Sequence, residues 1–174
     1  MPQQTAKSIF LTGFMGAGKT TVGQLLADIL KLPFVDLDAR IVLREQRSIA
    51  DIFSVEGEKY FRDCETALLE QLKEEPTAVY ATGGGIVVRE ANRNAMMNMG
   101  CVVYLHTSWT TLQNRLQHSV GRPLVDHDKE WDELKSLWDK RQEFYSKADI
   151  IVQTDGLTPP EVASIIAGEL LVKD

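Results

Sequence analysis

The sequence predicts an α/β protein in which helices cover both faces of a five-stranded parallel sheet. Short apolar runs typical of strands alternate along the chain with amphipathic segments typical of helices. A glycine-rich loop joins the first strand to the first helix, and the length of 174 residues suits one domain. Residues 1–174 show no repeat, linker or low-complexity tract, so we expect a single domain.

The strand-like runs are Ser8–Thr12, Pro33–Leu37, Ala78–Ala81, Val102–Leu105 and Ile150–Gln153. Between them lie the helical segments Gly18–Leu30, Ser48–Leu72, Arg89–Met99, Trp109–His118 and Lys129–Ser146. Ser8–Thr12 is nearly all apolar, as in a strand buried on both faces, whereas Gly18–Leu30 has apolar residues at helical spacing. A last helix is expected from Thr158, because Thr, Pro and then Glu161 form an N-terminal capping sequence.

The stretch Gly13–Thr20 reads GFMGAGKT and matches a phosphate loop. Such a loop points backbone N–H groups at an anion, and the helix N-terminus reinforces them. Lys19 can reach the outer phosphates, and the Thr20 hydroxyl can bind the accompanying Mg²⁺. The alternative is a chance glycine-rich turn, which the strand before it and the helix after it disfavour. We expect a nucleoside triphosphate held by Gly16, Ala17, Gly18, Lys19, Thr20 and Thr21.

Composition argues against several other classes of protein. The chain has 19 basic and 25 acidic side chains, a formal charge of −6 and no run of Lys or Arg, so we expect no nucleic-acid or membrane partner. No apolar stretch is long enough for a bilayer, and the first four residues lack signal character. Cys64 and Cys101 lack metal or redox spacing. We therefore expect a cytoplasmic protein and, further, a monomer.

Two carboxylates occur where the second strand runs out, in Asp36-Leu37-Asp38. No Asn-Lys-x-Asp guanine motif occurs, and the third strand ends in Thr82 and glycines rather than in an acid. Ligands bind at the carboxyl ends of parallel strands, and alternate residues of an extended segment point the same way. One aspartate could serve the metal while the other accepts a hydrogen bond from a substrate hydroxyl. The alternative is that Asp38 caps the next helix.

Glycines and arginines suggest the rest of the site. Gly83, Gly84 and Gly85 together cost backbone entropy, which predicts close approach of the backbone to a ligand, with a plain tight turn as the alternative. Arg62 lies beside an apolar helix face, with Glu65 three residues on to hold it. Arg141 is in line with an aromatic stripe, so either a structural carboxylate or an acidic ligand must pair with it.

Arg122 lies in the irregular segment of about residues 119–128, between Gly121 and Pro123. A loop that carries an arginine over a phosphate site excludes water and stabilises the transferred group. We expect this segment to be a lid, with a solvated loop charge as the alternative reading of Arg122.

Taken in order along nearly the whole chain, these motifs resemble the shikimate kinase family. The resemblance rests on Gly13–Thr20, 36–38, 57–65, 82–85, Arg115, 121–124, 141–145, Ala148 and Asp149. It implies transfer of the ATP γ-phosphate to the 3-hydroxyl of shikimate, in aromatic amino-acid biosynthesis. It also implies a three-layer fold like that of nucleoside monophosphate kinases, with strand order 2-3-1-4-5. A helical segment of about residues 39–72 would bind shikimate.

By position, the resemblance implies a role for each site residue. Lys19 would bind phosphate, Thr20 and Asp36 would serve Mg²⁺, and Arg115 would lie against adenine. Asp38 would contact the shikimate hydroxyls, while Arg62 and Arg141 would hold its carboxylate beside Gly83, Gly84 and Gly85. Lys19, Asp38 and the lid residue Arg122 would be catalytic.

Two alternatives remain at this stage. A gluconate-kinase-like enzyme also needs arginines for a carboxylate and an acid for a hydroxyl, so residue chemistry alone does not separate it. A non-catalytic nucleotide sensor with the same fold is disfavoured, because a sensor need not keep Lys19, Asp36, Asp38 and Arg122.

Overall fold

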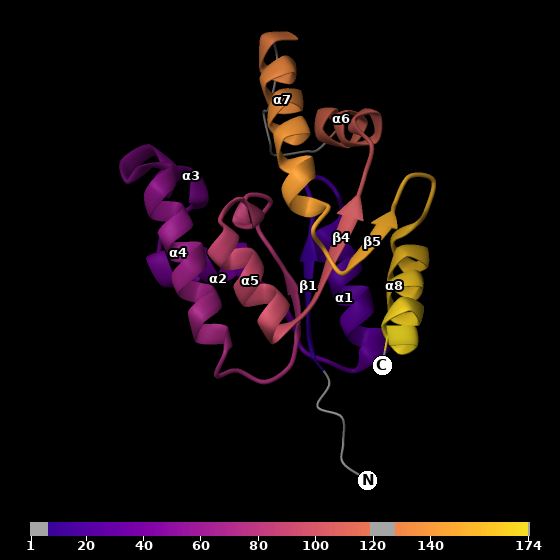
Figure 1. The fold of residues 1–174 in the computed structure, drawn as a ribbon. Coiled ribbons are helices and arrows are strands. Elements are labelled where there is room, and N and C mark those ends of the chain that lie inside the picture. Colours follow the sequence, from indigo (N-terminus) through magenta and orange to yellow (C-terminus); the bar gives the residue numbers. More distant parts are fainter. Residues whose placement is uncertain (1–6, 119–127, 174) are drawn as a thin grey trace.

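The structure, a computed structural model, describes residues 7–118 and 128–173. Its strands are β1 (Ser8–Thr12), β2 (Phe34–Asp36), β3 (Val79–Ala81), β4 (Gly100–His106) and β5 (Ile150–Gln153). They form one sheet of order β2-β3-β1-β4-β5 in which every pairing is parallel. The predicted fold class and strand order are therefore confirmed (Figure 1).

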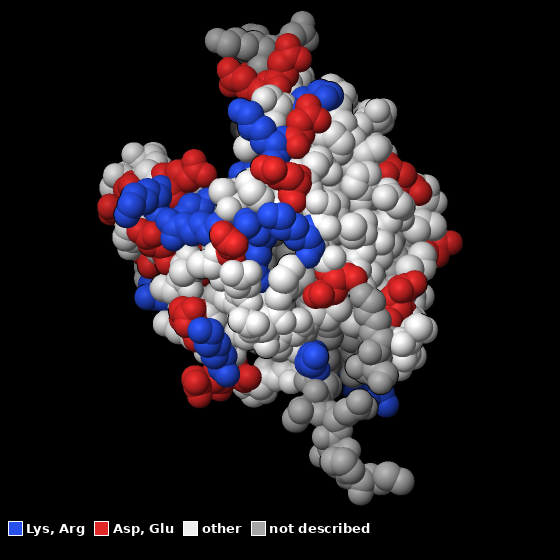
Figure 2. Space-filling model, viewed as in Figure 1, with Lys and Arg blue, Asp and Glu red and all other residues white. Residues whose placement is uncertain are grey.

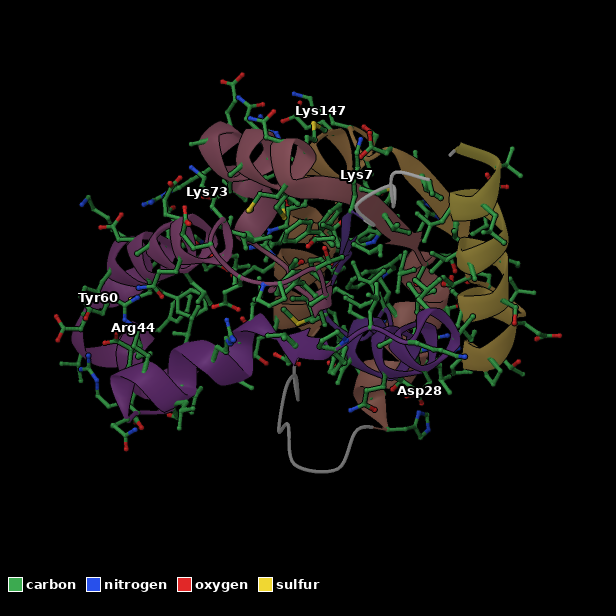
Figure 3. All side chains as sticks on the ribbon, turned by 90° about the horizontal axis from the view of Figure 1, so that it is seen from below. Lys7, Asp28, Arg44, Tyr60, Lys73 and Lys147 are labelled. Atoms are coloured by element: carbon green, nitrogen blue, oxygen red, sulfur yellow. The ribbon has the colours of Figure 1, made fainter. Side chains whose placement is uncertain are left out.

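Helices cover the sheet on both faces. They are α1 (Lys19–Leu30), α2 (Leu37–Glu45), α3 (Ile49–Val55), α4 (Gly57–Leu72), α5 (Glu90–Met99), α6 (Trp109–Gln117), α7 (Asp128–Tyr145) and α8 (Pro159–Lys173), with the 3-10 turn η1 (Ile86–Val88). α1 packs along α8. Figure 3 shows α1, which carries the labelled Asp28, and α5 on opposite sides of the sheet.

The core forms around the central strands because their side chains are apolar on both faces. Phe10 and Leu11 of β1 and Val103 and Leu105 of β4 are fully buried. Phe10 stacks on Tyr80 of β3 with ring centroids 5.0 Å apart. This rigid centre holds the carboxyl ends of the strands, and the loops that follow them, in one place.

The segment 37–72 differs from the expectation in two ways. Ser48–Leu72, predicted as one helix, is two helices, because Gly57 adopts a φ of 83° that a continuing helix does not allow. Residues 37–45 form helix α2, which the apolar pattern did not indicate but which lies largely within the helical segment of about residues 39–72 that the resemblance implied. Leu37 therefore begins a helix instead of ending a strand. The helix cap at this point is Asp36, whose Oδ1 accepts from the Ala39 N–H at 3.0 Å. Asp38 is not the cap.

The predicted start of the last helix is confirmed. Glu161 accepts hydrogen bonds from both the backbone N–H and the hydroxyl of Thr158, each at 2.7 Å, and α8 begins at Pro159. Thr158 and Glu161 thus pair at the start of the helix, as the sequence suggested, with the Glu161 carboxylate as the acceptor of both hydrogen bonds.

The tryptophans gather where α6 meets α7. The ring of Trp109 in α6 lies 6.1 Å from that of Trp131 and 6.2 Å from that of Trp138, both in α7. These contacts join the two helices that flank residues 119–127.

Basic and acidic side chains are interspersed on the face drawn in Figure 2. Several basic and acidic side chains of the described residues form ion pairs, as Arg89 does with Asp63 at 2.7 Å and Arg40 with Glu75 at 2.7 Å. None of the helices in the described residues combines the length and the apolar character that crossing a bilayer requires.

Candidate active site

The phosphate loop runs from the end of β1 into α1. Gly13, Gly16 and Gly18 have φ values of 149°, 80° and 95°, conformations that glycine adopts without strain. The Lys19 ammonium donates to the carbonyls of Gly13 at 2.7 Å and Phe14 at 3.0 Å, so it lies back over the loop. The loop is therefore a shaped turn with its lysine above it, the arrangement that receives phosphates.

Thr20 and Asp36 meet beside the loop. The Thr20 hydroxyl donates to Asp36 Oδ2 at 2.9 Å, although the two residues come from α1 and the end of β2. A hydroxyl and a carboxylate oxygen in contact are the hard oxygen ligands that Mg²⁺ takes together with phosphate oxygens. The donor set fits the predicted metal.

One cavity of about 840 Å³ extends from the phosphate loop to α3 and α4. It brings together many of the residues that the sequence singled out, namely Gly16, Gly18, Lys19, Thr20, Thr21, Asp36, Asp38, Arg62, Gly83, Gly84, Gly85 and Arg141. Asp36 and Asp38 both line it, but not for the predicted reason. Because the chain turns helical at Leu37, the two aspartates are not alternate residues of a strand.

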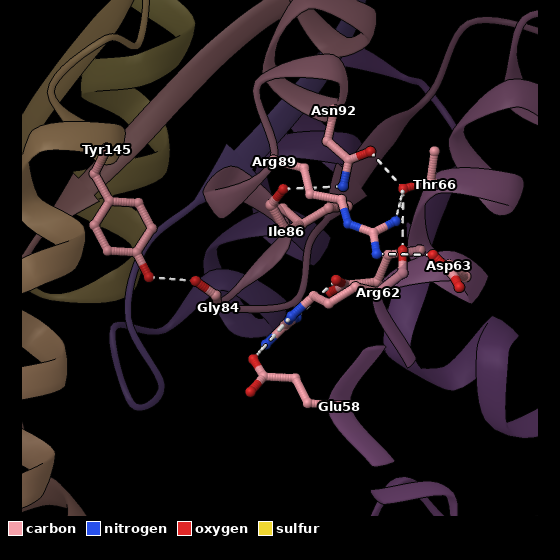
Figure 4. A network of polar contacts seen from close by, with 10 residues as sticks. Glu58, Arg62, Asp63, Thr66, Gly84, Ile86, Arg89, Asn92 and Tyr145 are labelled. Carbon is pink, nitrogen blue, oxygen red and sulfur yellow. Dashed lines mark hydrogen bonds and ion pairs between the residues drawn. The ribbon is translucent and has the colours of Figure 1, made fainter. Parts of the chain in front are cut away.

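Arg62 is held in the cavity wall by two glutamates. The residue is 9% exposed, and its guanidinium pairs with Glu65 at 2.6 Å and with Glu58 at 3.2 Å. Figure 4 shows the contact with Glu58. Burial raises the pKa of Glu65 above its ordinary value, although the charge of Arg62 opposes this rise. The predicted Arg62–Glu65 contact is confirmed, and it orients the guanidinium.

Arg141 projects from α7 into the same cavity and is 7% exposed. Its guanidinium carbon lies 5.8 Å from the ring centroid of Phe14 in the phosphate loop. In residues 7–118 and 130–172 no carboxylate forms an ion pair with it, and its buried Nε has no hydrogen-bond partner there. Of the two readings of Arg141, this geometry favours the acidic ligand, because a buried cation is rarely left unpaired.

The glycine turn after β3 is shaped by its neighbours. A side chain at Gly85 would place its Cβ 2.2 Å from Arg62 Nη2, and one at Gly83 would lie 2.7 Å from Asp38 Oδ1 and 2.8 Å from Glu65 Oε1. None of Gly83, Gly84 and Gly85 has a positive φ. Side chains of the site therefore approach Gly83 and Gly85 closely, whereas the predicted approach of the glycine backbone to a ligand stays a prediction.

A second cavity, of about 370 Å³, lies on the other side of the phosphate loop. Its lining includes Ala17, Arg115, Thr154, Leu157 and Pro159. Arg115 reaches back from α6 and donates to the Gly16 carbonyl at 3.0 Å. The sequence analysis predicted that Ala17 and Arg115 belong to the nucleotide site, but it did not predict that the residues after β5 line the same cavity. Pro159 was read only as a helix start, although β5 also ends at this sheet edge.

Arg122 and residues 119–127 lie outside the described residues. The predicted lid, and the catalytic role of Arg122 within it, therefore stay predictions.

A parallel sheet of this order, with a phosphate loop beside a cavity lined by two aspartates and two buried arginines, defines a phosphate-loop kinase of small molecules. The family model for shikimate kinase matches residues 15–170. The chain belongs to the shikimate kinase family.

Relatives and solved structures agree with this assignment. The chain is 38% identical over 164 residues to a shikimate kinase of Persephonella marina, covering 94% of this chain and 99% of the relative. It is 42% identical over 161 residues to one of Legionella pneumophila, covering 92% of each. The shikimate kinase from Acinetobacter baumannii in complex with shikimate matches with a TM-score of 0.90 and 34% identity, over 98% of this chain and 96% of that one.

More distant structures share only the fold. A gluconokinase from Sinorhizobium meliloti is 17% identical with a TM-score of 0.59, and a deoxyadenosine kinase from M. mycoides is 14% identical with a TM-score of 0.63. The gluconate-kinase reading of the sequence thus has the fold in common with this chain but not the family.

Proposed function

We propose that the protein transfers the γ-phosphate of ATP to the 3-hydroxyl of shikimate, forming shikimate 3-phosphate and ADP for aromatic amino-acid biosynthesis. Membership of the shikimate kinase family supports this directly. The structural observation that supports this function is the cavity of about 840 Å³, which is lined both by the phosphate loop and by Asp38, Arg62 and Arg141.

The nucleotide lies along the phosphate loop. The backbone N–H groups of residues 16–21 and the Lys19 ammonium bind the phosphates, and adenine extends into the second cavity beside Arg115. Thr20 and Asp36, which are in contact at 2.9 Å, would hold Mg²⁺, and the ion would neutralise phosphate charge when bound.

Shikimate occupies the other end of the large cavity. Its carboxylate pairs with Arg62 and Arg141, which come from α4 and α7 and whose burial makes each contact strong. Gly83, Gly84 and Gly85 form the adjacent wall. Asp38 faces the ring hydroxyls from the cavity wall, where its Oδ1 lies against the glycine turn, 2.7 Å from where a Cβ at Gly83 would stand.

In the reaction, Asp38 orients the 3-hydroxyl and accepts its proton as the hydroxyl oxygen bonds to the γ-phosphorus. The bond from that phosphorus to the β–γ bridging oxygen breaks, and the electron pair leaves with ADP. Lys19 stabilises the charge that spreads over the transferred phosphoryl group, and Arg122 adds to this when the lid closes.

We also propose that the enzyme acts as a monomer. We further propose a cytoplasmic enzyme without nucleic-acid or membrane partners, in line with the net charge of −6.

A coupled assay for ADP release tests the function with shikimate, with gluconate and with no acceptor. We expect ADP only with shikimate. ADP release that is independent of the acceptor would show that the protein is an ATPase. ADP release with gluconate would show that it is a gluconate kinase instead.

A further inference from the structure

The turn that follows β3 sets the position of several site groups at once. Gly85 lies against the Arg62 guanidinium, and Gly83 lies against Asp38. A Cβ at Gly84 would stand 3.5 Å from the Gly13 carbonyl and 3.7 Å from Arg141 Nη1. A shift of this turn would therefore change the spacing between both arginines, Asp38 and the phosphate loop.

The turn is held by its carbonyl groups, each of which has a donor. Within the backbone, the Gly83 and Gly85 carbonyls accept from the N–H groups of Ile86 and Val88 at 3.2 and 3.1 Å. From α5, the Asn92 side chain donates to the Ile86 carbonyl at 3.1 Å. The Arg93 guanidinium donates to the carbonyls of Val87 at 2.6 Å and Val88 at 3.1 Å.

The remaining carbonyl, that of Gly84, accepts from the hydroxyl of Tyr145 at 2.5 Å (Figure 4). Tyr145 stands at the end of α7, one helical turn after Arg141. This hydrogen bond is thus the link between the glycine turn and the helix that carries one of the two cavity arginines.

Tyr145 is fixed well enough to serve as such a link. It is 1% exposed, and its ring stacks on Tyr104 of β4 with centroids 4.9 Å apart and planes 16° apart. Burial raises the pKa of Tyr145 well above its ordinary value, although the charge of Arg141 opposes this. The hydroxyl therefore keeps its proton and donates throughout the pH range in which such enzymes work.

We propose that Tyr145 is a positioning residue of the shikimate site: its hydroxyl holds the glycine turn in register with α7, and thereby sets Gly84 and Arg141 around the substrate carboxylate. This rests on the proposed function of the cavity. Tyr145 is not among the residues that line the cavity, so it acts through the groups that it holds.

The test compares Tyr145→Phe with Tyr104→Phe. Each substitution removes one buried phenol hydroxyl from the same stacked pair, but the Tyr104 hydroxyl donates to the Gln142 side chain at 2.7 Å instead of to the turn. The shikimate KM, kcat, the Kd for ATP without shikimate and Tm are measured for both variants.

For Tyr145→Phe we expect the shikimate KM to rise about five- to twentyfold, because a buried carbonyl is left without its donor. The Kd for ATP should stay within about twofold, since the phosphate loop keeps its own bonds. For Tyr104→Phe the shikimate KM should not move, although Tm falls. The shift in Tm that shikimate alone produces gives the same comparison for any variant that folds but is too unstable for kinetics.

Two results would overturn the proposal. One is a Tyr145→Phe variant with lower Tm and an unchanged shikimate KM, which would leave only a structural role. The other is an equal loss of ATP and shikimate binding. The variant Arg141→Lys shows whether the Tyr145 proposal alone is wrong or whether the proposed shikimate site is wrong as well. If it raises the shikimate KM while Tyr145→Phe does not, the site stands and the positioning role falls.

Discussion

The guanidinium of Arg141 lies over the ring of Phe14, with its central carbon 5.8 Å from the ring centroid. Phe14 belongs to the phosphate loop and is 1% exposed, so a residue proposed to hold the acceptor rests on the loop that holds the donor. One cation–π contact thereby places the proposed acceptor site and the proposed nucleotide site on adjoining surfaces.

Substitution of Arg141 tests the proposed acceptor site. Arg141→Lys keeps the charge but loses the planar, bidentate group, so we expect a strong rise in shikimate KM, of about tenfold or more. The Kd for ATP in the absence of shikimate should change little. Arg89→Lys is the control, because Arg89 pairs with Asp63 at the surface and does not line the cavity. Equal losses for both ligands would assign Arg141 a structural role.

Gly85→Ala tests the packing of the other arginine. Gly85 has φ −100° and ψ 0°, which alanine can adopt, so the cost comes from the 2.2 Å approach of the new methyl to Arg62 Nη2. Arg62 must move, and we expect the shikimate KM to rise about tenfold or more. Gly168→Ala in α8 adds a methyl where nothing lies within 4 Å and should leave the KM alone. Wild-type kinetics for Gly85→Ala would show that shikimate binding does not depend on the position of the Arg62 guanidinium.

Lys19→Ala tests the nucleotide site. Lys19 is the lysine of the phosphate loop, so its removal should weaken ATP binding and lower kcat by about a hundredfold or more. Lys59→Ala is the matched control, since the Lys59 side chain is 89% exposed. The assay is ADP release at saturating shikimate. An unchanged rate in the Lys19 variant would remove the phosphate loop from the mechanism.

The two aspartates should respond differently to Mg²⁺. Asp36 contacts the Thr20 hydroxyl at 2.9 Å, so Asp36→Asn should lose activity that added Mg²⁺ partly restores. Asp38→Asn loses the proton acceptor while keeping the size of the side chain, so it should bind ATP normally and turn over about 10²- to 10⁴-fold more slowly at any Mg²⁺ concentration.

Phosphoryl transfer has a loose transition state. If the proton is removed late in the reaction, the loss of turnover in Asp38→Asn should lie toward the lower end of the range of about 10²- to 10⁴-fold. Rates for both aspartate variants across a Mg²⁺ titration make the comparison. Rescue of Asp38→Asn by Mg²⁺, with no rescue of Asp36→Asn, would mean that the two roles are reversed.

Sequence reasoning found the elements whose signals are local. The phosphate loop, the five strands and the start of α8 each depend on residues that are neighbours in the chain, such as the capping pair Thr158 and Glu161. The break at Gly57 was missed because the apolar stripe continues on both sides of it. The residue pattern did not indicate helix α2, because Asp36 looked like the end of a strand and not like the cap of a helix; only the resemblance implied helical structure from about residue 39.

What the sequence could not show is how distant segments meet. The glycines at 83–85 indicated close approach, but that Arg62, Asp38 and Glu65 lie against them depends on packing between α2, α4 and the turn. The contact between Tyr145 and Gly84 spans 61 residues and has no local signature. The same holds for Thr154 and Leu157, which reach the second cavity only because β5 ends beside the phosphate loop.

The cluster of Trp109, Trp131 and Trp138 has an optical consequence. These are the chain's three tryptophans, so its intrinsic fluorescence arises from the meeting point of α6 and α7. Arg115 belongs to the first of these helices and Arg141 to the second. Emission from the unlabelled protein should therefore register any change in the angle between the nucleotide-side and acceptor-side helices, and titrations with ATP and with shikimate can be followed without attaching a dye.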